Sequence, residues 1–354
     1  MEEIFLKVID LSITASWMVV AVLFLRLIFR RSPKWVCCFM WALVALRLVF
    51  PVSIESELSL LPSAELLPND ILYTETPKID SGIGFIDDLI NPLFSGAFSA
   101  NDVANAGAIQ TLISVFSWIW VYGAVAMLLY ALMSYMRLKS RVAESTPFCE
   151  NIKQCGNIAS PFVLGIFNPR IYLPYSISNA DIPYVVSHEK AHISRRDHLW
   201  KPIGFILLAI YWFNPLLWVA YILLCRDIER SCDEKVIREM KKEERRAYST
   251  ALLHCSVRHR AITACPTAFG ETDVKGRIKG IMGYKKPASA LVLLAITVTV
   301  ATAVCLFTVP IQKDSIENTV AYSDSGDTGG SGIGHIGGNG RDHHEDGHHK
   351  DSHH

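Results

Sequence analysis

Residues 202–224 read PIGFILLAIYWFNPLLWVAYILL, and the path of this apolar stretch decides the fold. About 20 apolar residues in a helix cross a bilayer, so hydropathy alone predicts a membrane span here. Asn214 and Pro215 interrupt the stretch at its middle, where proline removes a helix donor and clashes with the preceding turn. The alternative is a hairpin of two shorter helices. A span places the two flanking sequences on opposite sides of the membrane, and a hairpin keeps them on one side.

The sequence before this stretch, SHEKAHISRRDH at residues 187–198, contains two histidines four apart with a glutamate after the first. On a helix, His188 and His192 share a face and can bind one metal ion. Glu189 then lies beside the open coordination position, where it can act as a general base. The motif alone is incomplete, because a catalytic zinc has three protein ligands and a water.

The sequence after the apolar stretch, LCRDIERSCDEKVIREM at Leu224–Met240, predicts a charged helix that contains the missing ligand. Glu229 can bind the metal while Asp233, one turn on, accepts the second ring N–H of a ligating histidine. The alternative is a solvated face on which both acids pair with neighbouring cations. These cations are Arg226, Arg230 and Lys235.

The topology of 202–224 tests this site, because a single crossing would separate Glu229 from the two histidines. A hairpin at Asn214-Pro215 keeps all three on the same side. Basic residues precede and follow the stretch, which indicates that both flanks are cytoplasmic. They are Lys190, Arg195, Arg196 and Lys201 before it, and Arg226, Arg230, Lys235 and Arg238 after it. The charge pattern therefore favours the hairpin and a real metal site.

Residues beside the motif are assigned supporting or structural roles. Asp197 can orient His192 or pair with Arg195, and the sequence leaves both possibilities open. Cys232 is interpreted as a packed thiol rather than a ligand. Asp181 is a favourable N-cap for the first helix, which is predicted to run from about Ile182 to His198. The remaining histidines of this region are expected to be structural, and they are His198, His254 and His259.

The composition indicates a membrane protein, since 51% of the 354 residues are hydrophobic and 19% are charged. Of the 34 Lys and Arg residues, 24 fall between Arg137 and Lys286, which predicts a cytoplasmic domain there. Four stretches are long enough to span a bilayer. They are Phe5–Leu25, Trp35–Ile54, Thr111–Met136 and Ala288–Val309.

The segment 51–110 contains nine acids and one lysine, so we expect it outside the cell. The sequence begins MEE without a basic region, and we expect the first span to be an anchor, not a cleaved signal peptide. Both termini are then outside. The expected organisation is two spans in 1–54, an extracellular loop in 55–110, a third span in 111–136, a cytoplasmic domain in 137–286 with a re-entrant hairpin at 202–224, a fourth span in 287–309 and an extracellular tail in 310–354.

Strand signals occur in one region, where VLGIF and RIYLP flank an Asn-Pro turn and predict a small hairpin. The fold class is therefore mainly α: a polytopic membrane protein with four transmembrane helices and a cytoplasmic α+β domain. None of the nine cysteines falls in the segments expected outside, so a disulfide framework is not indicated. The Gly-rich tail holds seven of the twelve histidines, is expected to be disordered, and is a candidate metal-binding segment.

These motifs resemble the BlaR/MecR-type membrane zinc peptidases, the antirepressor family of Gram-positive bacteria. The matching stretches are SPFVLGIFNPRIYLP, VVSHEKAHISRRDHLW, YWFNPLLWVAYILL and DIERSCDEKVI. The resemblance implies a gluzincin-type cytoplasmic site, with His188, His192 and Glu229 as zinc ligands and Glu189 as base. Asp233 is then a residue that supports one of the ligands by a hydrogen bond. It also implies that the hairpin near Val163–Leu173 provides the edge strand along which an extended substrate binds by strand addition.

The best-known members sense β-lactams outside the bacterial cell and then cut themselves and a cytoplasmic DNA-binding repressor. About 45 polar residues follow the last span here, where those members have a penicillin-binding sensor domain, so we expect that domain to be missing. The leading hypothesis is a membrane-embedded zinc endopeptidase that cuts itself or a repressor, forms contacts with the lipid bilayer, can form homo-oligomers and does not bind nucleic acid directly. The alternatives are a non-proteolytic signalling or scaffold protein, and a metal sensor or transporter that uses the His-rich tail.

Overall fold

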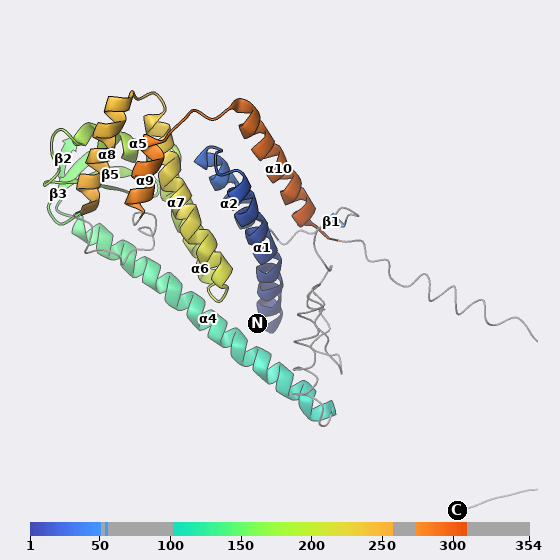
Figure 1. Ribbon diagram of the computed structural model, residues 1–354. Helices are drawn as coiled ribbons and strands as arrows, with labels where there is room; N and C mark the ends of the chain where they lie inside the picture. The colour runs from blue at the N-terminus through green and yellow to red at the C-terminus, as the bar shows by residue number, and fades with distance from the viewer. Residues whose placement is uncertain (51–53, 56–101, 258–272, 310–354) are drawn as a thin grey trace, which may run out of the picture. The chain divides into compact units, whose positions relative to one another are not determined.

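The computed structural model of the protein describes residues 1–50, 54–55, 102–257 and 273–309. Most of the expected extracellular loop, the whole His-rich tail and His259 lie outside the described residues. The described part is mainly helical with a small sheet, and it falls within one compact unit. The helices are α1 Glu2–Ile28, α2 Lys34–Val49, α4 Asp102–Arg141, α5 Ile182–Ser194, α6 Asp197–Ile210, α7 Pro215–Ile237, α8 Lys242–Val257, α9 Val274–Met282 and α10 Ser289–Phe307 (Figure 1).

Two helices among the described residues are long and apolar enough to cross a membrane, Glu2–Ile28 and Gln110–Arg141. They correspond to the first and third expected spans. The second expected span forms the shorter helix α2, and the fourth contains the apolar helix Ser289–Cys305. The count of four spans therefore stays a prediction.

The apolar stretch that decides the fold turns back between α6 and α7, which lie side by side (Figure 1). Asn214 is the N-cap of α7, and its side-chain oxygen accepts a hydrogen bond from the backbone N–H of Leu216 at 2.9 Å. Its amide nitrogen donates to the hydroxyls of Ser12 and Ser16 in α1, both at 2.8 Å. The same side chain thus begins α7 and attaches the turn to α1.

Aromatic side chains attach the tip of this hairpin to two more helices. The indole N–H of Trp120 in α4 donates to the last backbone carbonyl of α6 at 2.7 Å, and the indole of Trp212 donates to the carbonyl of Trp120 at 3.2 Å. The Tyr211 hydroxyl donates to the carbonyl of Leu48 in α2 at 2.9 Å. Gly123 allows this packing, because a Cβ there would lie 2.2 Å from the Trp212 ring.

Helix α7 continues without a break from the apolar stretch into the charged sequence. The separate helix expected over Leu224–Met240 was therefore wrong in its start and end. After the proline that begins α7, the helix contains no glycine and no second proline, so no strong helix breaker ends it before Ile237.

One face of α7 is held against α1 and α2. Asp227 is fully buried and accepts two hydrogen bonds from the guanidinium of Arg26, at 2.9 and 2.8 Å, and one from the indole of Trp41 at 3.1 Å. Two turns further on, Glu234 accepts the backbone N–H of Lys34 at 2.8 Å. Because these contacts occupy one face, the opposite face of α7 is available to pack against α5.

A four-stranded sheet precedes α5, with the order β2-β3-β5-β4. The strands are β2 Thr146–Cys149, β3 Ile152–Cys155, β4 Phe162–Leu164 and β5 Arg170–Pro174. The predicted hairpin forms as β4–β5, antiparallel, and β4 is an edge strand. Its turn requires Gly165, which has φ +119° and whose Cβ would lie 2.5 Å from the carbonyl oxygen of Asn168. Sequence analysis missed β2 and β3, which are short and show no apolar alternation.

A second, two-stranded sheet pairs β1 (Ile54–Glu55) with β6 (Thr308–Val309) in parallel. β1 follows α2 and β6 follows α10. The carboxyl-terminal ends of these two apolar helices therefore lie together.

Candidate metal centre

His188 and His192 lie four residues apart on α5, which packs against α7. Their Nε2 atoms are 3.1 Å apart. The Glu229 carboxylate on α7 lies 3.4 Å from Nε2 of His188 and 3.5 Å from Nε2 of His192. All three side chains are buried, and their ligand atoms fall within 4.8 Å of one another. Two imidazoles and one carboxylate in this arrangement fit a zinc ion.

The chain direction changes immediately after α5, which corrects the expectation of a helix that continues to His198. Arg196 adopts the left-handed conformation at φ 59°, and α6 begins at the next residue. This reversal returns Asp197 to α5, where Oδ2 lies 2.9 Å from Nδ1 of His192 and 3.3 Å from Nε of Arg195. Both partners considered for Asp197 therefore bind it together.

His188 reaches its supporting carboxylate through a tyrosine that sequence analysis did not select. The Tyr248 hydroxyl lies 2.8 Å from Nδ1 of His188 and donates to Oδ1 of Asp233 at 2.7 Å. A hydroxyl that donates to Asp233 is left to accept from His188, so Nδ1 carries the proton and Nε2 keeps its lone pair. The direct separation of His188 Nδ1 from Asp233 is longer, 3.4 Å.

We call the hydrogen-bonded series His188, Tyr248 and Asp233 the relay. The protonation states of Tyr248 and Asp233 are consistent with their roles as donor and acceptor. Burial raises the pKa of Tyr248 well above its ordinary value, and the neighbouring Asp233 raises it further, so the hydroxyl stays protonated. Burial alone would raise the pKa of Asp233, but Arg277 and the other partners lower it below its usual value. Asp233 is therefore an ionised acceptor for a neutral donor.

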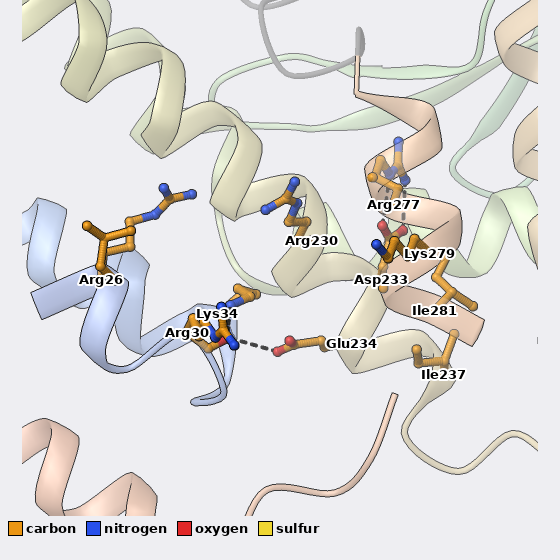
Figure 2. Close-up of a pocket in the computed structure, with 13 residues that line it drawn as sticks. Arg26, Arg30, Lys34, Arg230, Asp233, Glu234, Ile237, Arg277, Lys279 and Ile281 are labelled. Carbon is orange, nitrogen blue, oxygen red and sulfur yellow. Dashed lines mark hydrogen bonds and ion pairs between the residues drawn. The ribbon is translucent and has the colours of Figure 1, made fainter. Parts of the chain in front are cut away.

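Two cations also reach the ligand cluster. Lys201 Nζ lies 2.8 Å from Oε1 of Glu229, and an Arg277 nitrogen lies 3.3 Å from Oε2. Arg277 also binds Asp233 with two hydrogen bonds, at 2.8 and 2.7 Å (Figure 2). Burial would raise the pKa of Glu229, but Lys201 and the two histidines hold it well below its ordinary value. Glu229 is therefore an anion, as a ligand must be.

Cys232 belongs to a second group of possible ligands, with His192 and Asp197. Its sulfur lies 3.1 Å from the Asp197 carboxylate and 3.3 Å from Nδ1 of His192. Burial raises the pKa of the Cys232 thiol to about 11, so it donates to Asp197 as a neutral thiol. His192 Nδ1 is engaged by the same carboxylate. The geometry therefore favours the site that uses the Nε2 atoms.

Glu189 follows His188 on α5 and is buried. The side chains that sequence analysis missed come from three other elements, with Lys201 on α6, Tyr248 on α8 and Arg277 on α9. Sequence analysis used Lys201 only as one of the basic residues that indicate a cytoplasmic flank. Tyr248 comes soon after the charged sequence KKEERR at 241–246, which gives no sign of burial, but the tyrosine is fully buried.

The family model described as BlaR1 peptidase M56 matches residues 6–281 of the chain. Over 239 residues the chain is 25% identical to the methicillin resistance MecR1 proteins of Staphylococcus aureus and Staphylococcus epidermidis, covering 58% of this chain and 40% of each relative. Over 206 residues it is 25% identical to the regulatory protein BlaR1 of Bacillus licheniformis, covering 50% of this chain and 34% of the relative. The matched region thus spans less than half the length of these relatives.

Proposed function

The chain belongs to the BlaR1 peptidase M56 family, and from this premise we propose that it is a membrane-embedded zinc endopeptidase that transmits an external signal by proteolysis. The observation that carries the proposal is the convergence of His188, His192 and Glu229 beside Glu189. A zinc ion with a structural role alone would have no use for a buried glutamate immediately after a ligand.

In this mechanism His188, His192 and Glu229 hold the zinc. A bound zinc would act as a Lewis acid toward the peptide carbonyl and the attacking water. Glu189 takes a proton from that water and later gives it to the leaving amine. Asp197 accepts a hydrogen bond from Nδ1–H of His192 and so holds it in the tautomer whose Nε2 would be able to bind the metal.

The substrate is proposed to lie along β4. This strand is the edge of its sheet, so its outer backbone groups can pair with an extended peptide. The turn that follows β4 carries two exposed apolar side chains, Ile166 at 49% and Phe167 at 99% exposure. The proposed substrates are the chain itself and a cytoplasmic DNA-binding repressor, by analogy with the family resemblance. The protein also contacts lipid, can form homo-oligomers and is not proposed to bind nucleic acid.

The proposed topology has four spans, both termini outside and the peptidase domain in the cytoplasm of a bacterial cell. The pairing of β1 with β6 supports it, because the ends of α2 and α10 must then face the same side. The hairpin tip contacts Ser12 and Ser16, about 14 residues or roughly 20 Å from the inner end of α1. A hairpin this deep among α1, α2 and α4 is proposed to be re-entrant.

Replacement of Glu189 by glutamine tests the function. The full chain is expressed in a bacterium together with a candidate DNA-binding repressor, and the processing of both proteins is followed by immunoblotting while bound zinc is measured. Glu189→Gln keeps the size and hydrogen-bonding atoms of the side chain but removes the base. We expect zinc to remain bound and cleavage to fall roughly 10²–10⁴-fold.

Glu243→Gln is the matched control, because Glu243 is an exposed glutamate in the first turn of α8. It should cleave at the wild-type rate. Equal processing by the two variants would exclude Glu189 as the base. Purified wild-type protein without a bound transition metal would exclude the zinc peptidase as a whole.

A further inference from the structure

A cavity of about 460 Å³ lies where the end of α1 and the turn before α2 meet α7 and α9 (Figure 2). Cationic side chains dominate its wall. They are Arg26, Arg30, Lys34, Arg230, Arg277 and Lys279. Two carboxylates, Asp233 and Glu234, also line it. The excess of positive charge makes this cavity suited to an anion.

Three of these six cations already have carboxylate partners. Arg26 binds Asp227, Arg230 binds Asp273, and Arg277 binds Asp233. Arg30 and Lys279 differ: both are exposed, and within the described parts of the chain neither forms an ion pair. The Lys34 ammonium donates to the backbone carbonyl of Arg30 at 3.0 Å, which is a neutral acceptor.

The two wall carboxylates do not neutralise this pair. Asp233 is engaged by both Arg277 and Tyr248. Glu234 accepts the backbone N–H of Lys34 and also interacts electrostatically with the charge of that lysine. Arg30 and Lys279 therefore leave unmatched positive charge at the cavity, on opposite elements of its wall.

The surroundings of the cavity indicate an amphipathic ligand. Leu27 lines the same cavity and is 73% exposed, and its neighbours Phe24 and Ile28 are 63% and 56% exposed. These residues form the last turns of α1, which is long and apolar enough to be a span. A free phosphate ion would gain nothing from this apolar surface. A phospholipid would place its phosphate among the cations and its acyl chains along the end of α1.

We propose that the cavity binds the headgroup of an anionic phospholipid from the cytoplasmic leaflet. Arg30 and Lys279 donate to the phosphate oxygens, and Leu27 contacts the first acyl carbons. The proposal rests on the proposed membrane orientation of α1 and is independent of peptidase activity. The wall of the cavity is shared with the metal centre, since Asp233 and Arg277 contribute to both.

The test uses the full chain in mild detergent, titrated with short-chain phosphatidylglycerol, short-chain phosphatidylcholine or inorganic phosphate, with bound molecules counted by native mass spectrometry. The double variant Arg30→Gln/Lys279→Gln removes the unmatched charges. Because each cation near a lipid surface contributes about 1 kcal/mol, we expect phosphatidylglycerol to bind roughly tenfold or more weakly to this variant.

The matched control is Arg31→Gln/Lys275→Gln, which removes exposed cations from the same turn and the same helix but not from the cavity wall. It should bind phosphatidylglycerol as the wild type does. Gly280→Leu tests the space without changing charge, because a Cβ at Gly280 meets no atom within 4 Å and a longer side chain would enter the cavity. This variant should also lose phosphatidylglycerol.

Three results would overturn the proposal. Equal weakening by the two charge variants would mean that general electrostatic attraction, not this cavity, holds the lipid. Equal binding of phosphatidylcholine would exclude selection for an anion. Displacement of phosphatidylglycerol by an equal concentration of inorganic phosphate would identify a free-anion site. Cleavage by the wild type, measured in parallel, separates failure of this proposal from failure of the peptidase.

Discussion

Tyr248 connects an imidazole to a carboxylate at the centre of the site, and its hydroxyl is the group on which the orientation of His188 depends. It accepts from Nδ1 at 2.8 Å and donates to Asp233 at 2.7 Å. Asp233 is held in turn by Arg277. A ligand oriented by such a chain of hydrogen bonds loses affinity when any member is removed.

Tyr248→Phe removes this hydroxyl and leaves the ring in place. We expect the zinc dissociation constant to rise roughly 10- to 100-fold, because His188 Nδ1–H would then face Asp233 only across 3.4 Å. Competition with a chelating dye measures the change. Tyr175→Phe is the control, since that hydroxyl bonds Thr146 at the exposed end of the sheet. The same zinc affinity in both variants would show that Tyr248 does not orient His188.

At the scale of secondary structure, the α6–α7 hairpin delivers Glu229 to the histidines. Its turn depends on Asn214, which caps α7 and bonds two serines of α1. The length of α7 matters as well, because this helix must reach from the turn to the face of α5. The apolar half of α7 therefore positions Glu229, which lies in its charged half.

Asn214→Ala should lower the free energy of unfolding in detergent by roughly 1–3 kcal/mol, from the lost cap and the lost bonds to Ser12 and Ser16. Asn214→Ser should fall between this variant and the wild type, since serine can cap a helix but is too short to reach α1. Thermal unfolding followed by circular dichroism gives the order. A wild-type melting temperature for Asn214→Ala would show that the turn does not depend on this side chain.

At the scale of the whole molecule, the hairpin predicts that both of its flanks face the cytoplasm. Ser194→Cys precedes the hairpin and Glu239→Cys follows it, and both positions are exposed. In intact cells neither should react with a membrane-impermeant thiol reagent, and in inverted vesicles both should. Glu3→Cys should show the opposite pattern. Mass spectrometry of the labelled peptides separates these positions from the native cysteines, and labelling of the two flanks from opposite sides would contradict the topology.

The predictions that succeeded depended on local spacing. Two histidines four apart face the same way on any helix, so their Nε2 atoms converge without information from elsewhere. The break at Asn214-Pro215 and the β4–β5 hairpin also follow from residues adjacent in the sequence. The predicted end of α5 was wrong, because the chain turns at a single left-handed residue, Arg196, and no glycine or proline marks this position in the sequence.

The sequence by itself therefore determined the face of α5 that carries both histidines, the acidic pair on α7 and the position of the fold-back, since each depends on contacts within a few residues. Only the tertiary structure decided which side chains surround the proposed ligands. Lys201, Tyr248 and Arg277 reach Glu229, His188 and Asp233 because α6, α8 and α9 pack around α5 and α7. Such contacts join residues tens of positions apart, and the packing that brings them together leaves no periodic signal in the chain.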